Sequence, residues 1–285
     1  MKKLIICFMV LTYSTLNAQT IIQNKAIVYT TMNIIAPEDE ESRGGDGEGR
    51  QGMNFRNMMD GETKITTTIL NDKIKNDLRS ESVKSSIYRD ESKKLTTTVF
   101  EMMGTTSGFY VTDEEQAQMQ ARRDSMIAER RKKDSSAPAR PEKREPQISF
   151  SSTTETKKIA GYTCYKGYLI TTRLLGLKDS VSVWYTPEFT FQHVKFTGGI
   201  SGIQGMMGNV TLTGADKING FVMGYEMKMR RNRRMEVEVT KIDFKKEINE
   251  KDFDLPKDIE IKPMREMQNM FGNQRGGGMM RMGRE

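Results

Sequence analysis

Residues 220–244 alternate apolar and polar side chains on both sides of a short basic turn. From Phe221 to Met229 every second residue is aromatic or methionine, and from Met235 to Val239 every second residue is apolar. Successive side chains of a β-strand point to opposite faces, so this pattern predicts a β-hairpin with one buried face. The most regular pattern in the chain therefore favours an antiparallel sheet.

Short β-branched and aromatic runs recur at close spacing over residues 24–35, 63–112 and 148–191, separated by Asn, Asp, Gly and Ser. They predict a mainly β (α+β) fold built on a curved antiparallel sheet of roughly nine to eleven strands. The run "KKIAGYTCYKGYLITT", residues 157–172, is read as a strand that pairs with "DSVSVWYTPEF". Several strands are rich in threonine, which suits a half-exposed pleated surface.

One helix is predicted, over residues 112–133, with acidic residues in its first turn and basic residues in its last. Its apolar stripe is thin, so we expect a surface excursion. It lies in a single β-rich domain spanning residues 19–262. Residues 36–62 and 134–147 have compositions typical of flexible inserts, and 263–285 form a Met/Gly/Arg-rich tail that we expect to be disordered.

Residues 1–18 have the layout of a secretory signal peptide, with a basic start, an apolar core and a small-residue end. We expect an exported protein, periplasmic or associated with the cell envelope, and without a transmembrane segment. Removal of residues 1–18 would leave Cys164 as the one cysteine, so no intramolecular disulfide is expected. The chain carries a net charge of +7, but export makes nucleic acid an unsuitable partner.

The side chains that most enzymes use are scarce. His193 is the single histidine and has no recognisable partner in the sequence, and Cys164 lacks a nearby base or a second thiol. Alternation places Cys164 on the same strand face as Tyr162, Tyr168 and Ile170, which indicates a core position. We therefore predict a protein that is not an enzyme and has no cofactor.

Methionine is abundant, with 22 residues in the chain. No metal site is favoured, but a Cu(I)- or Ag(I)-binding site is an alternative because thioether sulfur prefers soft monovalent ions. Its ligands would be Met264, Met267, Met270, Met279, Met280 and Met282. The simpler interpretation is that Met264, Met267 and Met270 form one helical stripe and that the methionines of the strands fill an adaptable core.

The basic turn of the hairpin is the densest charge in the ordered part of the chain. It consists of Lys228, Arg230, Arg231, Arg233 and Arg234. A solvated hairpin tip explains it, and contact with anionic lipid or an acidic envelope protein is the functional alternative.

Three motifs carry a resemblance to a family: "IAGYTCYKGYLIT", "VSVWYTPEF" and "KIDFKKEINEKDFDLP". Over roughly residues 20–110 and 148–260 the chain resembles exported bacterial proteins of a domain-of-unknown-function family related to GLPGLI-type proteins. "GGISGIQGMMGN" stands where the GLPGLI motif would lie but lacks its proline and second leucine. The resemblance implies a half-barrel like the lipoprotein carriers LolA and LolB, in which a curved antiparallel sheet surrounds an apolar cavity.

The function expected from this fold is non-enzymatic binding of an apolar ligand, lipid or lipoprotein in the cell envelope. The residues expected to line such a cavity, or to form the core, are Tyr162, Tyr168, Trp184, Tyr185, Phe189 and Phe191. Two alternatives stay open: the methionine-rich metal binder, and an envelope module that binds a protein partner without any ligand.

Overall fold

The computed structural model describes residues 20–35, 61–81, 83–102, 104–133, 147–172, 176–191, 212, 214–229 and 232–266. The expected signal peptide, His193 and the chain beyond Glu266 lie outside these ranges, as do residues 36–60 and 134–146 of the two expected inserts.

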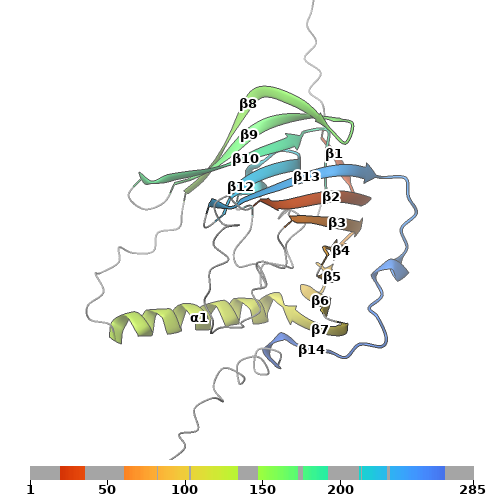
Figure 1. The fold of residues 1–285 in the computed structure, drawn as a ribbon, viewed down its shortest axis with the longest axis vertical. Helices are drawn as coiled ribbons and strands as arrows, with labels where there is room; N and C mark the ends of the chain where they lie inside the picture. The colour runs from red at the N-terminus through yellow and green to blue at the C-terminus, as the bar shows by residue number, and fades with distance from the viewer. Residues whose placement is uncertain are drawn as a thin grey trace, which may run out of the picture.

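Twelve strands form one curved sheet (Figure 1), in the spatial order β14-β7-β6-β5-β4-β3-β2-β13-β12-β10-β9-β8. Its strands are β2 (Lys25–Ile35), β3 (Gly61–Leu70), β4 (Lys73–Arg79), β5 (Lys84–Asp90), β6 (Leu95–Met102), β7 (Thr105–Thr112), β8 (Gln147–Ile159), β9 (Tyr162–Thr172), β10 (Lys178–Thr186), β12 (Phe221–Lys228), β13 (Arg234–Asp243) and β14 (Ile261–Pro263). All neighbours are antiparallel except β14 and β7. The strands at the two edges, β14 and β8, are not paired with each other, so the sheet is open.

Two further strands, β1 (Ile21–Gln23) and β11 (Phe189–Phe191), form a separate parallel pair. The mainly β fold, with a curved antiparallel sheet and one long helix, confirms the prediction. The described strands number fourteen, more than expected, because β1, β11 and β14 have three residues each. Three residues are too few to show a period of two, so such strands escape sequence analysis.

One face of the sheet is buried, and we call it the inner face. On β2 it carries the even-numbered side chains from Ala26 to Ile34, and on the other strands the side chains in register with them. Its first core cluster comprises Met32, Ile34, Ile65, Leu78, Ile87, Leu169, Val183, Leu212, Ile218, Val222, Tyr225, Met235 and Val237. Its second core cluster comprises Ala26, Val28, Ile69, Ile159, Cys164, Phe189, Phe191, Phe221, Met223 and Val239.

The hairpin predicted from alternation is present as β12 and β13. Met227 faces Met235 and Tyr225 faces Val237, so the apolar residues of both arms share the inner face. The turn is closed by a hydrogen bond of 2.7 Å from the backbone N–H of Met229 to the carbonyl oxygen of Arg233. This hairpin joins the two clusters, because Phe221 and Val239 belong to the second and Tyr225 to the first.

The run 157–172 is not one strand, as the sequence suggested, but the end of β8, a two-residue turn and β9. Ile159 pairs with Tyr162, which leaves Ala160 and Gly161 as a two-residue loop with φ of 50° and 89°. Two consecutive positive φ angles define a turn of type I′, whose twist matches that of the flanking strands. The I-A-G-Y motif therefore has a structural reason: it reverses the chain between β8 and β9.

Replacing Ala160 by Asn should stabilise the protein, because asparagine tolerates the left-handed conformation better than alanine. We expect the free energy of unfolding in urea to rise by about 0.5–1 kcal/mol. The matched variant Gly161→Ala should lower it by about 1 kcal/mol, since a Cβ there meets no atom within 4 Å and acts through backbone strain alone. A fall in stability for Ala160→Asn would contradict the assigned turn.

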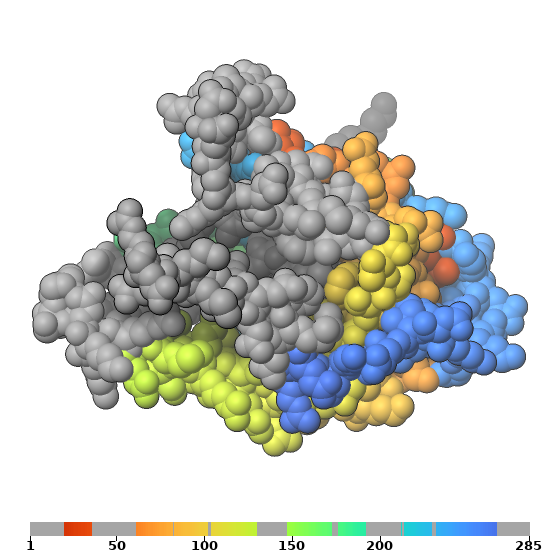
Figure 2. All heavy atoms as spheres, turned by 60° about the horizontal axis from the view of Figure 1, so that its bottom comes forward, coloured from red at the N-terminus to blue at the C-terminus, as the bar shows by residue number. Residues whose placement is uncertain are grey.

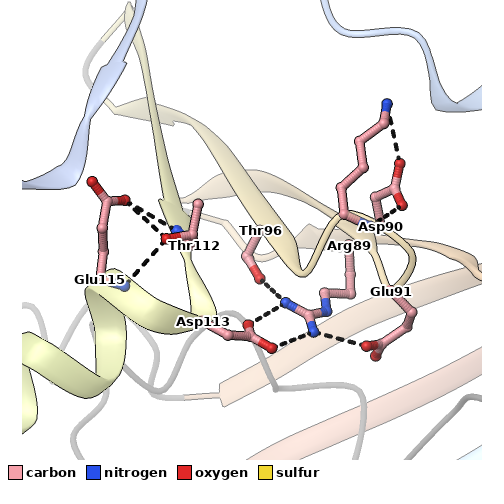
Figure 3. A network of polar contacts seen from close by, with 8 residues as sticks. Arg89, Asp90, Glu91, Thr96, Thr112, Asp113 and Glu115 are labelled. Atoms are coloured by element: carbon pink, nitrogen blue, oxygen red, sulfur yellow. Dashed lines mark hydrogen bonds and ion pairs between the residues drawn. The ribbon is translucent and has the colours of Figure 1, made fainter.

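Helix α1 (Asp113–Lys133) begins directly after β7, one residue later than predicted. A capping box starts it: the Glu115 N–H donates to the Thr112 hydroxyl, and the Thr112 N–H donates to the Glu115 carboxylate at 3.1 Å. Arg89 of β5 then donates to both carboxylate oxygens of Asp113, at 2.6 and 2.9 Å (Figure 3). The same guanidinium also donates to Glu91, so one arginine ties β5 to the first residue of the helix.

Beyond this anchor the helix runs along the bottom of the molecule in Figure 1, whereas the strands β8, β9 and β10 lie at the top. Its main contact is with β7, and most of its described side chains are exposed, among them Met126 and Ile127. The described part of the helix is thus a largely exposed element at the surface of the protein. None of the helices in the described ranges has the length and apolar character needed to cross a membrane.

The chain after β13 returns to the far edge of the sheet. It passes the 3-10 helix η6 (Glu250–Phe253), where Glu250 pairs with Lys73 of β4, and ends beside β7 as β14. Figure 2 shows this segment in dark blue against the yellow strands. Gly108 permits the approach, because a Cβ there would lie 3.1 Å from Ile261.

The anchor of α1 should depend on pH. Its hydrogen bonds from Arg89 lower the pKa of Asp113, so the ion pair is complete above the ordinary aspartate pKa of about 4 and is lost as pH falls through the depressed value. We expect hydrogen exchange of residues 110–118, corrected for the intrinsic rate, to be constant from pH 7 to 5 and to accelerate below about pH 4. In Asp113→Asn exchange should be fast throughout, and a wild-type profile in that variant would contradict the assignment.

Candidate functional site

The inner face is the best candidate for a functional surface, because the strands of its two halves carry different kinds of side chain. On β9, β10, β12 and β13 it is apolar, with residues such as Leu169, Val183 and Val237. On β2 to β6 it mixes apolar residues with buried hydroxyl and amide groups. These polar residues are Thr30, Thr63, Thr67, Asn76, Ser85 and Thr98.

The burial of these threonines corrects the sequence interpretation, which placed threonine on a half-exposed surface. Thr63 is 1% exposed and Thr67 is 6% exposed. The pattern Thr63-Ile65-Thr67-Ile69 puts all four on the inner face, since they alternate with Lys64, Thr66 and Thr68. Period two was visible in "TKITTTIL", but it could not show that a polar residue shared the buried side.

Two of the buried hydroxyls, those of Thr67 and Ser85, have hydrogen-bond partners within the sheet. The Thr67 hydroxyl donates to the Asn76 side-chain oxygen at 2.7 Å, and the Ser85 hydroxyl donates to the Val99 carbonyl at 3.1 Å. Thr63 differs: its Oγ1 is buried and has no hydrogen-bond partner among the residues that the structure describes. A buried unpaired hydroxyl costs about 1–3 kcal/mol.

One described segment between β11 and β12 packs across the inner face. It includes Leu212, the 3-10 helix η4 (Ala215–Lys217) and Ile218, and its apolar residues join the first core cluster. Gly214 has a φ of 91°, and a Cβ there would lie 2.3 Å from Cγ2 of Ile148. This glycine lets the segment lie close against β8.

The second core cluster is rich in aromatic residues: two of the six predicted lining or core residues, Phe189 and Phe191, belong to it, and two others, Tyr162 and Trp184, pack against it. Phe189 and Phe191 are buried, and Tyr162 packs edge-on against Phe189 with the ring centroids 5.1 Å apart. Phe221 and Phe244 complete the group, at 5.3 and 5.2 Å from Phe189. Burial raises the pKa of Tyr162, as does the nearby charge of Glu188. This cluster closes the end of the sheet beside β1 and β11.

Of the predicted residues, Tyr168 lies on the opposite, outer face beside Lys166, whereas Trp184 packs against the second core cluster and has two lysines of the outer face over its ring. Trp184 pairs with Lys166 of β9 and with Gly224 of β12. The Lys157 and Lys166 ammonium groups lie 4.8 and 5.7 Å from its ring, and Lys166 also lies 5.9 Å from the ring of Tyr168. Sequence alternation placed Tyr168 with Cys164 in the core; the structure instead places it beside Lys166.

Both lysines over Trp184 are also paired with carboxylates. Lys157 lies 2.8 Å from Glu238 and Lys166 lies 2.6 Å from Glu155. The charges of this outer patch therefore balance, and it resembles the solvated side of an antiparallel sheet. The sixth predicted residue, Tyr185, packs edge-on against Phe150 at the margin of the first core cluster, and its hydroxyl lies 2.9 Å from that of Ser152.

Cys164 occupies the core position expected for it. Its side chain is 0% exposed, within the second core cluster, and Sγ lies 3.6 Å from the Tyr162 carbonyl oxygen. Burial raises the pKa of the thiol to about 11. The thiol is therefore neutral at physiological pH, which is the unreactive form.

Thiol labelling should distinguish this buried cysteine from a reactive one. In the chain starting at Gln19, Cys164 should react with a disulfide reagent at pH 8 at least a hundredfold more slowly when native than in urea, roughly as expected for a buried, protonated thiol. The measurement is stopped-flow absorbance, with free cysteine at the same pH as control. Native labelling as fast as in urea would show that the thiol is accessible.

The remaining predicted groups are only partly within the described residues. Arg234 of the basic turn contacts Glu226 at 3.7 Å and Glu236 at 3.0 Å, and Lys228 is exposed, whereas Arg230 and Arg231 lie outside. Of the methionines proposed as metal ligands, Met264 alone is described. No cluster of three or more His, Cys, Asp or Glu side chains suited to a metal occurs in the described ranges.

Comparisons with known proteins give a limited result. No protein-family model and no curated protein sequence matches the chain. Among solved structures the chain is similar to PNGF-II in two crystal forms, with sequence identities of 13% and 14% and TM-scores of 0.37 and 0.38. The similarity covers 89% and 88% of this chain, and 34% and 33% of the PNGF-II chains. The chain thus spans about a third of the length of PNGF-II.

A third similar structure is a domain named for outer-membrane lipoprotein sorting, from Vibrio parahaemolyticus. The identity is 8% and the TM-score 0.20, over 81% of this chain and 89% of that domain. At these identities and TM-scores the similarities assign neither a family nor an activity to the chain. Its function must be argued from its own residues.

Proposed function

We propose that this chain is an exported, non-enzymatic protein that binds an apolar ligand or lipid on the inner face of its curved sheet, in the cell envelope. Export rests on the signal-peptide pattern of residues 1–18, and the lack of enzymatic activity rests on the scarcity of catalytic side chains in the sequence.

The observation that carries the proposal is the extent of the inner face. Its first core cluster runs from Ile87 on β5 to Leu169 on β9, with six strands lying between these two in the sheet. Among the described residues, those of the cluster that lie outside the strands come from the short segment 212–218. A long apolar face on a curved sheet suits an elongated apolar ligand.

The side chains of this face also suit a ligand of variable shape. Met32 and Met235 are fully buried in the first core cluster, and Met227 and Met229 pack at its margin. Methionine has three flexible torsions and a polarisable sulfur, so a methionine-lined surface can repack around different chains. The buried hydroxyls on β2 to β6 would provide the few polar contacts that orient a bound lipid.

The two alternatives have weaker support. Five of the six methionines proposed for Cu(I) or Ag(I) lie outside the described residues, so that hypothesis rests on the sequence alone. A partner-binding module would use the exposed helix α1 or the basic turn, but Arg234 is already paired with carboxylates. The inner face is therefore a better-supported site than the methionine-rich tail, the helix α1 or the basic turn.

Native mass spectrometry tests the proposal. The protein, purified from the envelope fraction of its own host, should carry an adduct of lipid mass that survives gentle desolvation and is removed by solvent extraction. A bare polypeptide mass, without lipid and without copper, would contradict ligand binding and favour the interaction module.

A matched variant locates the ligand. The double substitution Lys157→Ser and Lys166→Ser alters the outer face around Trp184 and leaves the inner face intact, so the adduct should persist at the wild-type fraction. Loss of the adduct in this variant would place the lipid on the outer face instead.

A further inference from the structure

The Thr63 hydroxyl stands out among the buried polar groups. Its Oγ1 is the one buried side-chain oxygen or nitrogen in the described part of the chain that has no hydrogen-bond partner. The residue lies on β3 opposite Met32 of β2, two residues before Ile65. Both of these inner-face neighbours, Met32 and Ile65, are apolar residues of the first core cluster.

Thr67, one inner-face position beyond Ile65 on the same strand, shows what a structural hydroxyl looks like in this sheet. Its Oγ1 donates to Asn76 across the β3–β4 pair at 2.7 Å. Asn76 is itself buried, so each group satisfies the other. Thr63 has no equivalent partner, and a valine of nearly the same shape would fill its space without the cost of an unpaired hydroxyl.

We propose that Thr63 Oγ1 is the polar contact of the ligand site, and that it donates a hydrogen bond to an acyl carbonyl of a bound lipid. The acyl chain would lie along the first core cluster, so this inference rests on the proposed function and makes it more specific. The hydroxyl that is unpaired in the free protein becomes paired in the complex.

The surroundings of Thr63 select an uncharged acceptor. Met32 and Ile65 flank it on the inner face, whereas the charged Glu62 and Lys64 alternate with it and point to the outer face. A carboxylate buried among apolar side chains without a cation is strongly unfavourable. The site should therefore prefer an ester or amide carbonyl to a free fatty acid.

Access to Thr63 requires side chains to move, because Oγ1 is buried in the free chain. Met32 lies directly across the strand pair, and Met235 pairs with Ile34 one inner-face position along β2. Both are unbranched side chains that can change rotamer at low cost. They are the residues that would make room for the carbonyl.

Competition binding with three probes of similar chain length tests the inference. Methyl oleate, oleic acid and the hydrocarbon 8-heptadecene are each titrated into the wild-type protein in complex with the apolar fluorophore diphenylhexatriene, and displacement of the fluorophore gives the affinity of each probe. Methyl oleate should bind about threefold to tenfold more tightly than the hydrocarbon, the range expected for one neutral hydrogen bond. Oleic acid at neutral pH should bind more weakly than its ester.

The variant Thr63→Val should lose the preference for the ester and bind the hydrocarbon as the wild type does, whereas Thr63→Ser should keep the preference. The melting temperature of ligand-free Thr63→Val should be equal to or above that of the wild type, because the variant loses an unpaired hydroxyl. The control Thr67→Val should melt at a lower temperature, because Asn76 loses its donor, but should keep the ester preference.

The outcomes separate this inference from the proposed function. If the wild type binds all three probes alike, or if Thr63→Val keeps the ester preference, Thr63 is not the polar contact, and binding on the inner face stands. If the wild type binds none of the probes, both the inference and the proposed lipid-binding function fail.

Discussion

Cross-strand register decides which side chains of this protein are buried, because a slip of one residue would turn every inner-face side chain to solvent. The described part of the sheet contains no disulfide that could hold the register, since Cys164 is a free thiol. Short turns hold it instead: Ala160–Gly161 joins β8 to β9, and Asn71 at φ 54° begins the two-residue turn from β3 to β4. The two core clusters form only while these turns keep each strand in phase with the next.

Local register shifts then explain why the two faces of the sheet are not simply core and surface. Between Trp184 and Tyr185 the pairing of β10 with β12 skips Met223, so the buried side of β10 passes from the odd-numbered Val183 to the even-numbered Thr186. A similar change occurs along β9, where Cys164 belongs to the second core cluster and Leu169 to the first. A bulge increases the local twist of a strand, and this twist allows the two ends of β9 and β10 to bury opposite sides.

The sequence therefore predicted the fold better than it predicted the site. The β12–β13 hairpin and α1 were readable because alternation and end charges persist over many residues. Alternation groups the aromatic residues near Cys164 as one lining set, yet Phe189 lies in the second core cluster and Tyr185 at the margin of the first. Their separation depends on a register shift, which single-sequence periodicity does not encode. The buried threonines were missed for a different reason, since threonine has the same strand preference on either face.

The hydroxyls of the inner face bear on whether this surface evolved for packing or for binding. A core selected for stability alone favours apolar residues, because each buried hydroxyl contributes little when paired and costs free energy when unpaired. Thr67 and Asn76 satisfy each other and are compatible with a structural role. Thr63 is not, since valine would fit the same strand and the same space. An unpaired hydroxyl beside adaptable methionines is the arrangement expected where a reversibly bound ligand supplies the missing hydrogen-bond partner.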